Sequence, residues 1–357
     1  MSRSSSASSS SSSRREFLRR SAAIAAGAAA SAAAGPAFAL RRRETPDERI
    51  AIEHRKLGRT GLDVALLGFG GAEIGYERTD QKAVSLLLNG ALDAGMNVID
   101  TAECYVDSEE LIAEAVGHRR KEYHLFTKCG HFTESGGRGS DWSSAGISKS
   151  VERSLKRLAT DVLDLVQLHS CPLGELEKGE CIAALEKAKK EGKTRFIGYS
   201  GDSKAARFAV ESGRFDTLQT SLSFLDQEAI DLTLPLAAKN GVGVITKRTI
   251  GNAVWRYDDR PPSGYHAEYW RRMKELDYEF TRPGRRDDEG PEGPAGTALR
   301  FVAAQPAVSV MLVGTTKPAR WRQNAGLLSA GPLPKEALEK MRSRWKEVAK
   351  PDWTGQT

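Results

Sequence analysis

The chain has 357 residues, which is enough for one large barrel-type domain or two ordinary domains. Hydrophobic residues make up 39% and charged residues 28% of the chain, which is typical of a soluble globular protein. The net charge is +6, but +4 of it lies in residues 1–39, so the body carries about +2. That balance excludes the strongly basic character of a nucleic-acid-binding protein.

The first forty residues differ in composition from the rest. A serine-rich stretch leads into the adjacent arginines Arg14 and Arg15, followed by Glu-Phe-Leu and an Ala/Gly-rich run over 21–40. This arrangement resembles a twin-arginine export signal. We therefore expect residues 1–39 to engage the export machinery, which makes the protein periplasmic or otherwise exported, with no stable membrane span after signal removal. A disordered Ser/Ala tail is the alternative interpretation.

The segment 40–53 is charged and is predicted to be a linker, and a main domain is predicted over 54–333. A small hairpin that turns at 59–61 opens this domain. After the hairpin, apolar segments alternate with segments of helical periodicity. Strands are expected at 65–71, 98–100, 123–128, 163–169, 195–200, 217–220, 242–247 and 309–313, and helices at 80–94, 108–116, 146–158, 179–191, 204–212, 227–239, 297–304 and 318–328.

These eight strand–helix units predict an α/β fold. Strands that are apolar throughout are typical of parallel sheets buried on both faces. Eight such units close into a (β/α)8 TIM barrel more naturally than into an open sheet. A long polar insert is expected at 248–292, after the seventh strand, and a C-terminal helix and tail at 334–357.

In such a barrel, functional side chains belong at the carboxyl ends of the strands. Asp100, Lys128, His169 and Ser200 all fall there in the predicted scheme, and Tyr105 follows Asp100 in the next loop. A single carboxylate at a strand end is as readily a helix cap as a catalytic group. Several such groups at one end of one barrel favour a catalytic site.

Seven short motifs along 55–330 give the chain a specific resemblance to a known family. They are LGRTGL at 57–62, VIDTAECY at 98–105, FTK at 126–128, SLKRL at 154–158, DLVQLH at 164–169, GYS at 198–200 and GTT at 314–316 with Asn324. In order and spacing they resemble the aldo-keto reductase superfamily. The resemblance implies an NADP(H)-dependent oxidoreductase that reduces aldehyde or ketone carbonyls of a small-molecule substrate by hydride transfer.

The resemblance implies a catalytic tetrad of Asp100, Tyr105, Lys128 and His169, and the chemistry of these groups agrees with it. A forming alkoxide needs a proton, and a free tyrosine is a weak donor at neutral pH. An ammonium beside Tyr105 would stabilise the phenolate and make the phenol a stronger acid. Asp100 would hold that ammonium in place, and His169 would donate a hydrogen bond to the substrate oxygen.

The resemblance also implies cofactor-binding residues after several strands. Gly71 follows the first strand, and Ser200 and Gln219 would bind the nicotinamide carboxamide. Two departures stand out. Relatives usually read Ser-Asn where this chain has Ser200-Gly201, which removes one expected hydrogen bond. Where many relatives place a stacking tyrosine after the seventh strand, this chain has Lys247 and Arg248, which would contact ribose or pyrophosphate or would lie on a solvated rim.

The segment that begins at Gly314 carries the expected preference for NADP(H). Thr315 or Thr316 would cap a helix, whose free N–H groups and dipole favour an anion. Lys317 and Arg320 add positive charge, and no acidic residue is present in this segment. By resemblance, Arg320 binds the adenosine 2′-phosphate and Asn324 contacts adenine. A basic, solvated helix start is the alternative.

Two other functions remain open at this point. Lys128 could form a Schiff base in an aldolase, or the chain could be a non-catalytic NADP-binding regulatory protein. Substrate choice is left to the loop 130–143 and the insert 248–292, whose aromatic residues either line a pocket or pack the insert onto the barrel. Four cysteines lack metal-ligand spacing and are too few for a disulfide scaffold, so we expect ordinary core residues.

Overall fold

The computed structural model describes residues 50–134, 137–262, 264–282 and 290–356. These residues belong to one unit of the chain, Asp47–Thr357. The leader expected at 1–39 and most of the expected linker lie outside the described residues.

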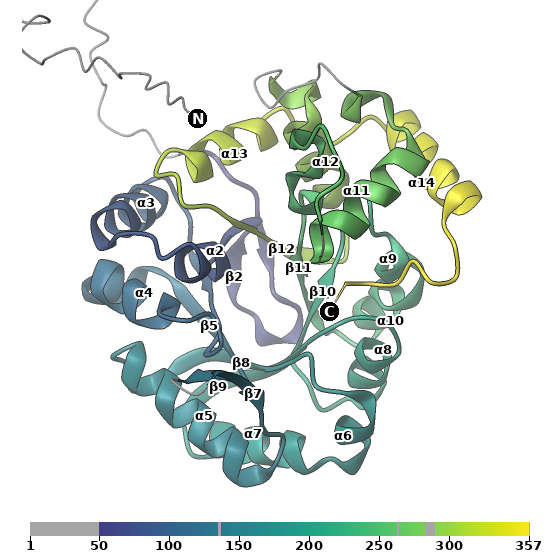
Figure 1. Ribbon diagram of the computed structural model, residues 1–357. Helices are drawn as coiled ribbons and strands as arrows, with labels where there is room; N and C mark the ends of the chain where they lie inside the picture. Colours follow the sequence, from purple (N-terminus) through teal and green to yellow (C-terminus); the bar gives the residue numbers. More distant parts are fainter. Residues whose placement is uncertain (1–49, 135–136, 263, 283–289, 357) are drawn as a thin grey trace, which may run out of the picture. The chain divides into compact units, whose positions relative to one another are not determined.

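Eight parallel strands close into a barrel, in which the last strand pairs with the first (Figure 1). Neighbouring strands follow one another in chain order, and the connections return through helices on the outside. This arrangement confirms the predicted (β/α)8 TIM barrel. The strands are β3 (Leu67–Gly70), β4 (Val98–Asp100), β5 (His124–Cys129), β8 (Leu163–His169), β9 (Thr194–Ser200), β10 (Thr217–Ser221), β11 (Gly243–Lys247) and β12 (Val308–Gly314).

The surrounding helices follow the predicted apolar stripes. Asp80 precedes α3 and accepts a hydrogen bond from the Ala83 N–H at 3.0 Å, and Ser143 caps α5 in the same way. The helices are α2 (Ala72–Tyr76), α3 (Gln81–Asp93), α4 (Ser108–Val116), α5 (Ser144–Arg157), α6 (Leu173–Lys178), α7 (Glu180–Lys190), α8 (Ser203–Glu211), α9 (Glu228–Leu232), α10 (Leu234–Lys239), α11 (Gly264–Leu276), α12 (Pro294–Ala303), α13 (Arg320–Leu328) and α14 (Lys335–Val348).

The structure differs from the predicted elements in several connections. The expected loop at 130–143 contains a hairpin, β6 (His131–Glu134) and β7 (Gly137–Ser140). The helix expected at 227–239 is broken into α9 and α10, because Pro235 lies in the first turn of α10 and cannot donate to a preceding turn. The insert is not merely polar loop, since it contains α11.

The N-terminal hairpin closes the amino-terminal end of the barrel. β1 (His54–Lys56) and β2 (Asp63–Ala65) pair antiparallel, and Leu57 between them is fully buried. It joins a cluster of apolar side chains inside the barrel, made of Leu57, Leu62, Val64, Val98, Phe126, Leu165, Ile245, Val310 and Leu312. The amino-terminal end of the barrel is therefore filled by apolar side chains, and the polar residues that face inward lie at the opposite, carboxyl end.

Strand register then brings the predicted site residues to one end. Asp100 lies opposite Gly70 on one side and Phe126 on the other. Lys128 pairs with Gln167 of the next strand. His169 pairs with Ser200, which continues the same row. The register therefore assembles residues that are far apart in sequence.

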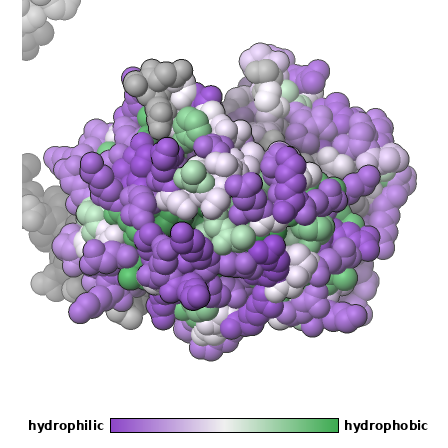
Figure 2. Space-filling view, turned by 90° about the horizontal axis from the view of Figure 1, so that it is seen from below, coloured by the Kyte–Doolittle hydropathy of each residue, from purple (hydrophilic) through white to green (hydrophobic). Residues whose placement is uncertain are grey.

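One face of the molecule is largely polar (Figure 2). Figure 2 shows one face covered mostly by hydrophilic residues, with smaller hydrophobic areas between them. Among the described residues, no helix combines the length and apolarity needed to span a bilayer.

Candidate active site

A buried ion pair forms the base of the site. The Lys128 ammonium contacts the Asp100 carboxylate, and both side chains are almost completely shielded from solvent. Lys128 also donates to the Thr101 carbonyl at 2.8 Å. The second Asp100 oxygen accepts from the amides of Gln167 at 3.2 Å and Gln219 at 3.0 Å. A pair held by this many hydrogen bonds fixes the ammonium in one place.

Tyr105 lies above this pair. Its ring centroid is 5.0 Å from the Lys128 nitrogen. Burial, and then the Asp100 charge, raise the pKa of Tyr105 well above its ordinary value. This direction is opposite to the one predicted from a neighbouring ammonium, because the buried surroundings and the Asp100 carboxylate disfavour a phenolate more than the positive charge of Arg248 favours it. The phenol therefore keeps its proton at neutral pH.

His169, the last residue of β8, stands edge-on to the Tyr105 ring with 5.6 Å between the centroids. Burial, and then the charges of Lys128 and Lys247, hold the pKa of His169 well below its ordinary value. The imidazole is therefore neutral at pH 7 and carries a single N–H donor. A phenol and a neutral imidazole thus face the same space above the ion pair.

Ser200 and Gln219 form a second row beside the tetrad. The Ser200 hydroxyl donates to the Gln219 carbonyl oxygen at 2.8 Å, and the Gln219 amide donates to Asp100. These two predicted cofactor residues are therefore linked to the ion pair by hydrogen bonds, Gln219 directly and Ser200 through Gln219. Gly201 stands where relatives usually have asparagine, and the reason is steric. A Cβ at position 201 would overlap the buried Tyr199 phenol, which donates to the Cys171 carbonyl at 3.0 Å.

A further polar network follows the ends of β9, β10 and β11. Lys247 pairs with Asp202 at 2.9 Å, and burial lowers the pKa of Lys247 to about 8. Arg248 donates to the Ser221 hydroxyl at 3.1 Å and lies 4.1 Å from the Tyr265 ring centroid. Lys247 is therefore half-buried and paired with Asp202, which is not the fully solvated side chain of the rim alternative.

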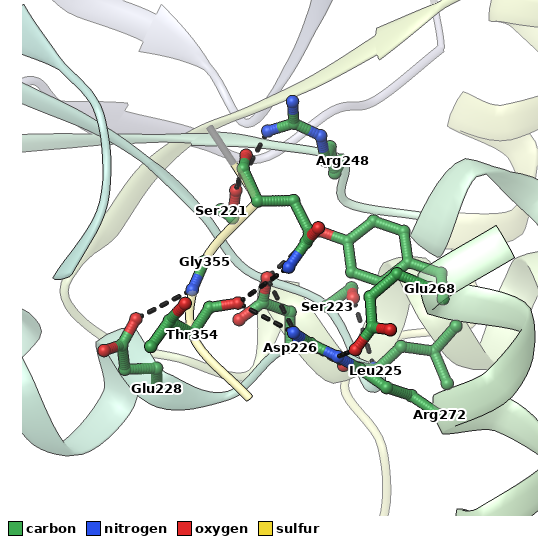
Figure 3. Close-up of polar contacts among 12 residues, drawn as sticks. Ser221, Ser223, Leu225, Asp226, Glu228, Arg248, Glu268, Arg272, Thr354 and Gly355 are labelled. Atoms are coloured by element: carbon green, nitrogen blue, oxygen red, sulfur yellow. Dashed lines mark hydrogen bonds and ion pairs between the residues drawn. The ribbon is translucent and has the colours of Figure 1, made fainter. Parts of the chain in front are cut away.

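The C-terminal segment lies beside Ser221, Glu228 and Arg272, as Figure 3 shows. The Arg272 guanidinium donates to the Thr354 carbonyl at 2.8 Å, and the Gly355 N–H donates to Glu228 at 2.8 Å. The Gly355 backbone lies so close to Asp202 that a Cβ would overlap the Asp202 side chain. The end of the described chain is thus packed onto residues next to the site.

Positive charge gathers near the end of β12. Lys317 is exposed, Arg320 is half-buried at the start of α13, and Asn324 is buried one turn further. Burial, and then the charge of Arg320, lower the pKa of Arg256, so a second guanidinium from the insert faces the same region. The predicted threonine cap is wrong, since Ala319 precedes α13 and Thr315 instead accepts from the Lys317 N–H at 3.1 Å.

Two glycines allow close packing around this end. The Gly71 N–H donates to the Asp100 carbonyl at 2.7 Å, and a Cβ on Gly71 would crowd the Ser108 hydroxyl. A Cβ on Gly314 would overlap the carboxylate of Glu73. Glu73 is exposed at its outer edge, and the protein atoms around its carboxyl group raise its pKa. An acidic group therefore lies beside the predicted anion-binding segment.

The aromatic residues of the loops divide into two groups. Trp255 and Tyr269 are buried, and Tyr269 donates to Asp226 at 3.0 Å, so these two pack the insert onto the barrel. Tyr265 stays exposed against Arg248. Trp142 lies against the His131 ring with 5.2 Å between the centroids, and His131 is 5.7 Å from His169. The β6–β7 hairpin is therefore the loop that reaches the tetrad.

Sequence reasoning missed several of these contacts. Nothing in the motifs singled out Glu73 or Arg256, and the C-terminal segment carried no signal. Cys104 was predicted, with the other three cysteines, to be an ordinary core residue, whereas its Sγ is 3.3 Å from the Nδ1 atom of His169. Only the identity of its neighbour in the VIDTAECY motif could have directed attention to it.

Comparisons with known proteins identify the family and the fold of the chain. The family profile described as Aldo/keto reductase family matches residues 66–346. A Bacillus subtilis (strain 168) protein, "Uncharacterized oxidoreductase YqkF", is 30% identical over 308 residues, covering 83% of this chain and 97% of that protein. "L-galactose dehydrogenase" of Arabidopsis thaliana is 34% identical over 210 residues, covering 55% and 64%. The holo form of "aldo-keto reductase AKR11C1 from Bacillus halodurans" has a TM-score of 0.71 at 27% identity, covering 85% and 99%.

Proposed function

Because the chain belongs to the aldo/keto reductase family of oxidoreductases, we propose that it reduces aldehyde or ketone carbonyls to alcohols with NADP(H), using Tyr105 as the proton donor. One observation carries the proposal: a buried Asp100–Lys128 pair lies beneath a phenol and a neutral imidazole that face each other. Carbonyl reduction needs this combination of a held proton and a neutral hydrogen-bond donor.

The side chains divide the work of such a reduction. The bound nicotinamide nucleotide supplies the hydride. Tyr105 holds its proton until negative charge develops on the substrate oxygen, when the nearby Lys128 ammonium favours its release. His169 donates a hydrogen bond to the same oxygen, and Asp100 keeps Lys128 charged and stationary. The high pKa of Tyr105 ensures that the proton is present when substrate arrives.

The residues present also fit a phosphorylated dinucleotide. Ser200 and Gln219 offer hydroxyl and amide groups suited to a carboxamide. Arg320, Lys317 and the guanidinium of Arg256 supply charge for a 2′-phosphate. The carboxylate of Glu73 lies beside Gly314 and opposes an anion there when it is ionised.

Nucleotide preference is tested through Arg320. Arg320→Ala should weaken NADPH binding by about 1–3 kcal/mol, the scale of a charge-assisted hydrogen bond, and leave NADH binding nearly unchanged. Fluorescence-quenching titrations of both nucleotides measure this difference. Arg322→Ala, two residues further along the same helix, is the matched control. Equal losses for NADH and NADPH in Arg320→Ala would show that Arg320 does not read the 2′-phosphate.

The activity is tested by NADPH consumption with a panel of aldehydes and ketones. Because one relative is named L-galactose dehydrogenase, the panel also includes aldoses with NADP+ in the oxidative direction. Nucleotide binding without turnover across the panel would favour the regulatory alternative. Covalent labelling of Lys128 by borohydride with a carbonyl compound would favour the aldolase alternative, against which the ion pair with Asp100 argues, since a Schiff base needs a neutral amine.

We also propose that the leader exports the folded enzyme by the twin-arginine route. The support is the Arg14-Arg15 pair with its Ala-rich run. Export of folded protein suits an enzyme that acquires a nucleotide before it crosses the membrane. Arg14→Lys with Arg15→Lys should leave the unprocessed protein in the cytoplasm, as fractionation with immunoblotting would detect. Normal processing and export of this double variant would contradict the proposal.

A further inference from the structure

A thiol touches the catalytic imidazole. Cys104 lies between Glu103 and Tyr105 in the loop after β4, and its Sγ is 3.3 Å from the His169 Nδ1. The side chain is 8% exposed, so bulk water does not compete freely for this contact. The Cys104 carbonyl accepts from the Thr133 hydroxyl at 3.0 Å, which ties the loop to β6. The backbone of Cys104 is thus fixed by a side-chain hydroxyl of the neighbouring strand β6.

The hydrogen atom in this contact lies either on the Cys104 sulfur or on the His169 Nδ1. Burial raises the pKa of the Cys104 thiol to about 11, so sulfur keeps its hydrogen at neutral pH. The imidazole is neutral, because its pKa is far below the ordinary value. A neutral imidazole has one N–H and one lone pair. Either S–H donates to Nδ1, or Nδ1–H points at sulfur.

The first arrangement is the stronger of the two. An imidazole lone pair is a good acceptor, whereas a thiol sulfur is a weak one. Within the described part of the chain, Cys104 is the only hydrogen-bond partner of the His169 ring. Lys128, Lys247 and Arg248 are cations that offer no lone pair, and the neighbouring His131 ring, 5.7 Å away between centroids, makes no hydrogen bond to His169 in the described part of the chain. No competing acceptor among the described residues therefore draws the proton toward Nδ1.

We propose that Cys104 is a positioning residue, whose thiol donates to Nδ1 of His169 and so fixes the ring hydrogen on Nε2. The tautomer of a histidine is set by the hydrogen bond that its other nitrogen makes. With the hydrogen on Nε2, the ring can donate to a substrate oxygen. With the hydrogen on Nδ1, the Nε2 lone pair would repel that oxygen. The catalytic meaning rests on the proposed role of His169, but the tautomer itself is independent of turnover.

The tautomer is read directly by NMR on protein labelled with 15N in its six histidines. Two-bond and three-bond proton–nitrogen correlations distinguish Nε2–H from Nδ1–H rings, and His169→Gln assigns the signals. We expect the wild-type ring to be in the Nε2–H form, with a hydrogen-bonded Nδ1. Cys104→Ser should keep this pattern, because a hydroxyl also donates. Cys104→Ala should shift Nδ1 toward an unbonded value and allow a mixture of tautomers.

Kinetics provide a second measurement on the same variants. Cys104→Ala should lower kcat between about twofold and tenfold with little change in KM, since the bond from the ring strengthens only as charge develops on the substrate. Cys104→Ser should recover most of that loss. Cys181→Ala is the matched control, because this buried thiol contacts Cys171 and not the imidazole.

Two results would overturn the inference. One is a wild-type His169 ring in the Nδ1–H form. The other is a Cys104→Ala spectrum in which the Nδ1 signal and the tautomer are unchanged. A wild-type ring in the Nδ1–H form would also remove the proposed hydrogen bond from Nε2 of His169 to the substrate, but either result would leave hydride transfer with Tyr105 as the proton donor standing. Conversely, a protein that shows the expected tautomer but never turns over NADPH would refute the activity and keep the Cys104 contact.

Discussion

Replacing Asp100 with asparagine should destabilise the protein far more than an ordinary surface change. Asp100→Asn preserves shape and one amide-accepting oxygen, but it leaves the Lys128 ammonium buried with only the Thr101 carbonyl as a described partner. Breaking a buried pair by removing one partner typically costs about 3–5 kcal/mol, because the remaining charge is uncompensated. We expect a loss of this size in the free energy of unfolding at pH 7. Asp161→Asn, at an exposed position, should change it by less than about 0.5 kcal/mol.

The pH dependence of this loss has a definite sign. An unpaired buried ammonium has a folded-state pKa below its unfolded-state value near ~10.4. The penalty is therefore complete below the folded-state pKa and shrinks as pH rises toward the unfolded-state pKa. Adding Lys128→Met removes the charge altogether, so the double variant should recover much of the stability. It should not recover turnover, because the group that favours proton release from Tyr105 is gone.

Urea denaturation, followed by circular dichroism at several pH values, measures these differences. The expected order of stability at pH 7 is wild type, then the double variant, then Asp100→Asn. An Asp100→Asn protein within about 1 kcal/mol of wild type at pH 7 would refute the reasoning, since Lys128 would then not depend on Asp100. So would a penalty that grows with pH.

Three further predictions concern Tyr105, Glu73 and the C-terminal segment. Tyr105→Phe should keep NADPH affinity but lower kcat by on the order of 10²-fold or more; near-normal rates in a folded variant would remove Tyr105 from the mechanism. Glu73→Gln should tighten NADPH binding by about 0.5–1 kcal/mol. In wild type, NADPH binding should weaken as pH rises through the raised pKa of Glu73, and Glu73→Gln should abolish this weakening. Glu114→Gln is the control. The same pH dependence of NADPH binding in Glu73→Gln and wild type would contradict the prediction. Gly355→Val should lower the free energy of unfolding by about 1–3 kcal/mol through overlap with Asp202, whereas Gly326→Ala, which has open space, should not; equal stability would show that the segment is not packed there.

Short-range patterns were sufficient to locate most of the barrel and the tetrad. Asp100 and His169 end strands whose apolar runs are visible in the sequence, and Lys128 is the next-to-last residue of its strand. The barrel topology forces these strand ends together. Errors arose where one residue interrupts a pattern, as Pro235 does between α9 and α10. Thr315 likewise looked like a helix cap, but the chain turns once more before α13 begins.

Long-range contacts set the features that no pattern could supply. Gly201 is explained only by the Tyr199 phenol, whose position depends on packing against the Cys171 carbonyl. The direction of the Tyr105 pKa shift depends on how burial and the Asp100 charge outweigh a nearby cation, which spacing alone does not reveal. The contact between Gly355 and Asp202 joins parts of the chain that share no motif.

The central claim is hydride transfer between a nicotinamide nucleotide and a carbonyl at the Tyr105 site. It is tested most directly with NADPH deuterated at the transferring position, mixed with the enzyme and an aldehyde that it consumes. Mass spectrometry of the product alcohol should find one deuterium on the former carbonyl carbon with wild type, and product formation should be strongly slowed in Tyr105→Phe. An alcohol without deuterium, or a product formed equally well without the nucleotide, would contradict the claim.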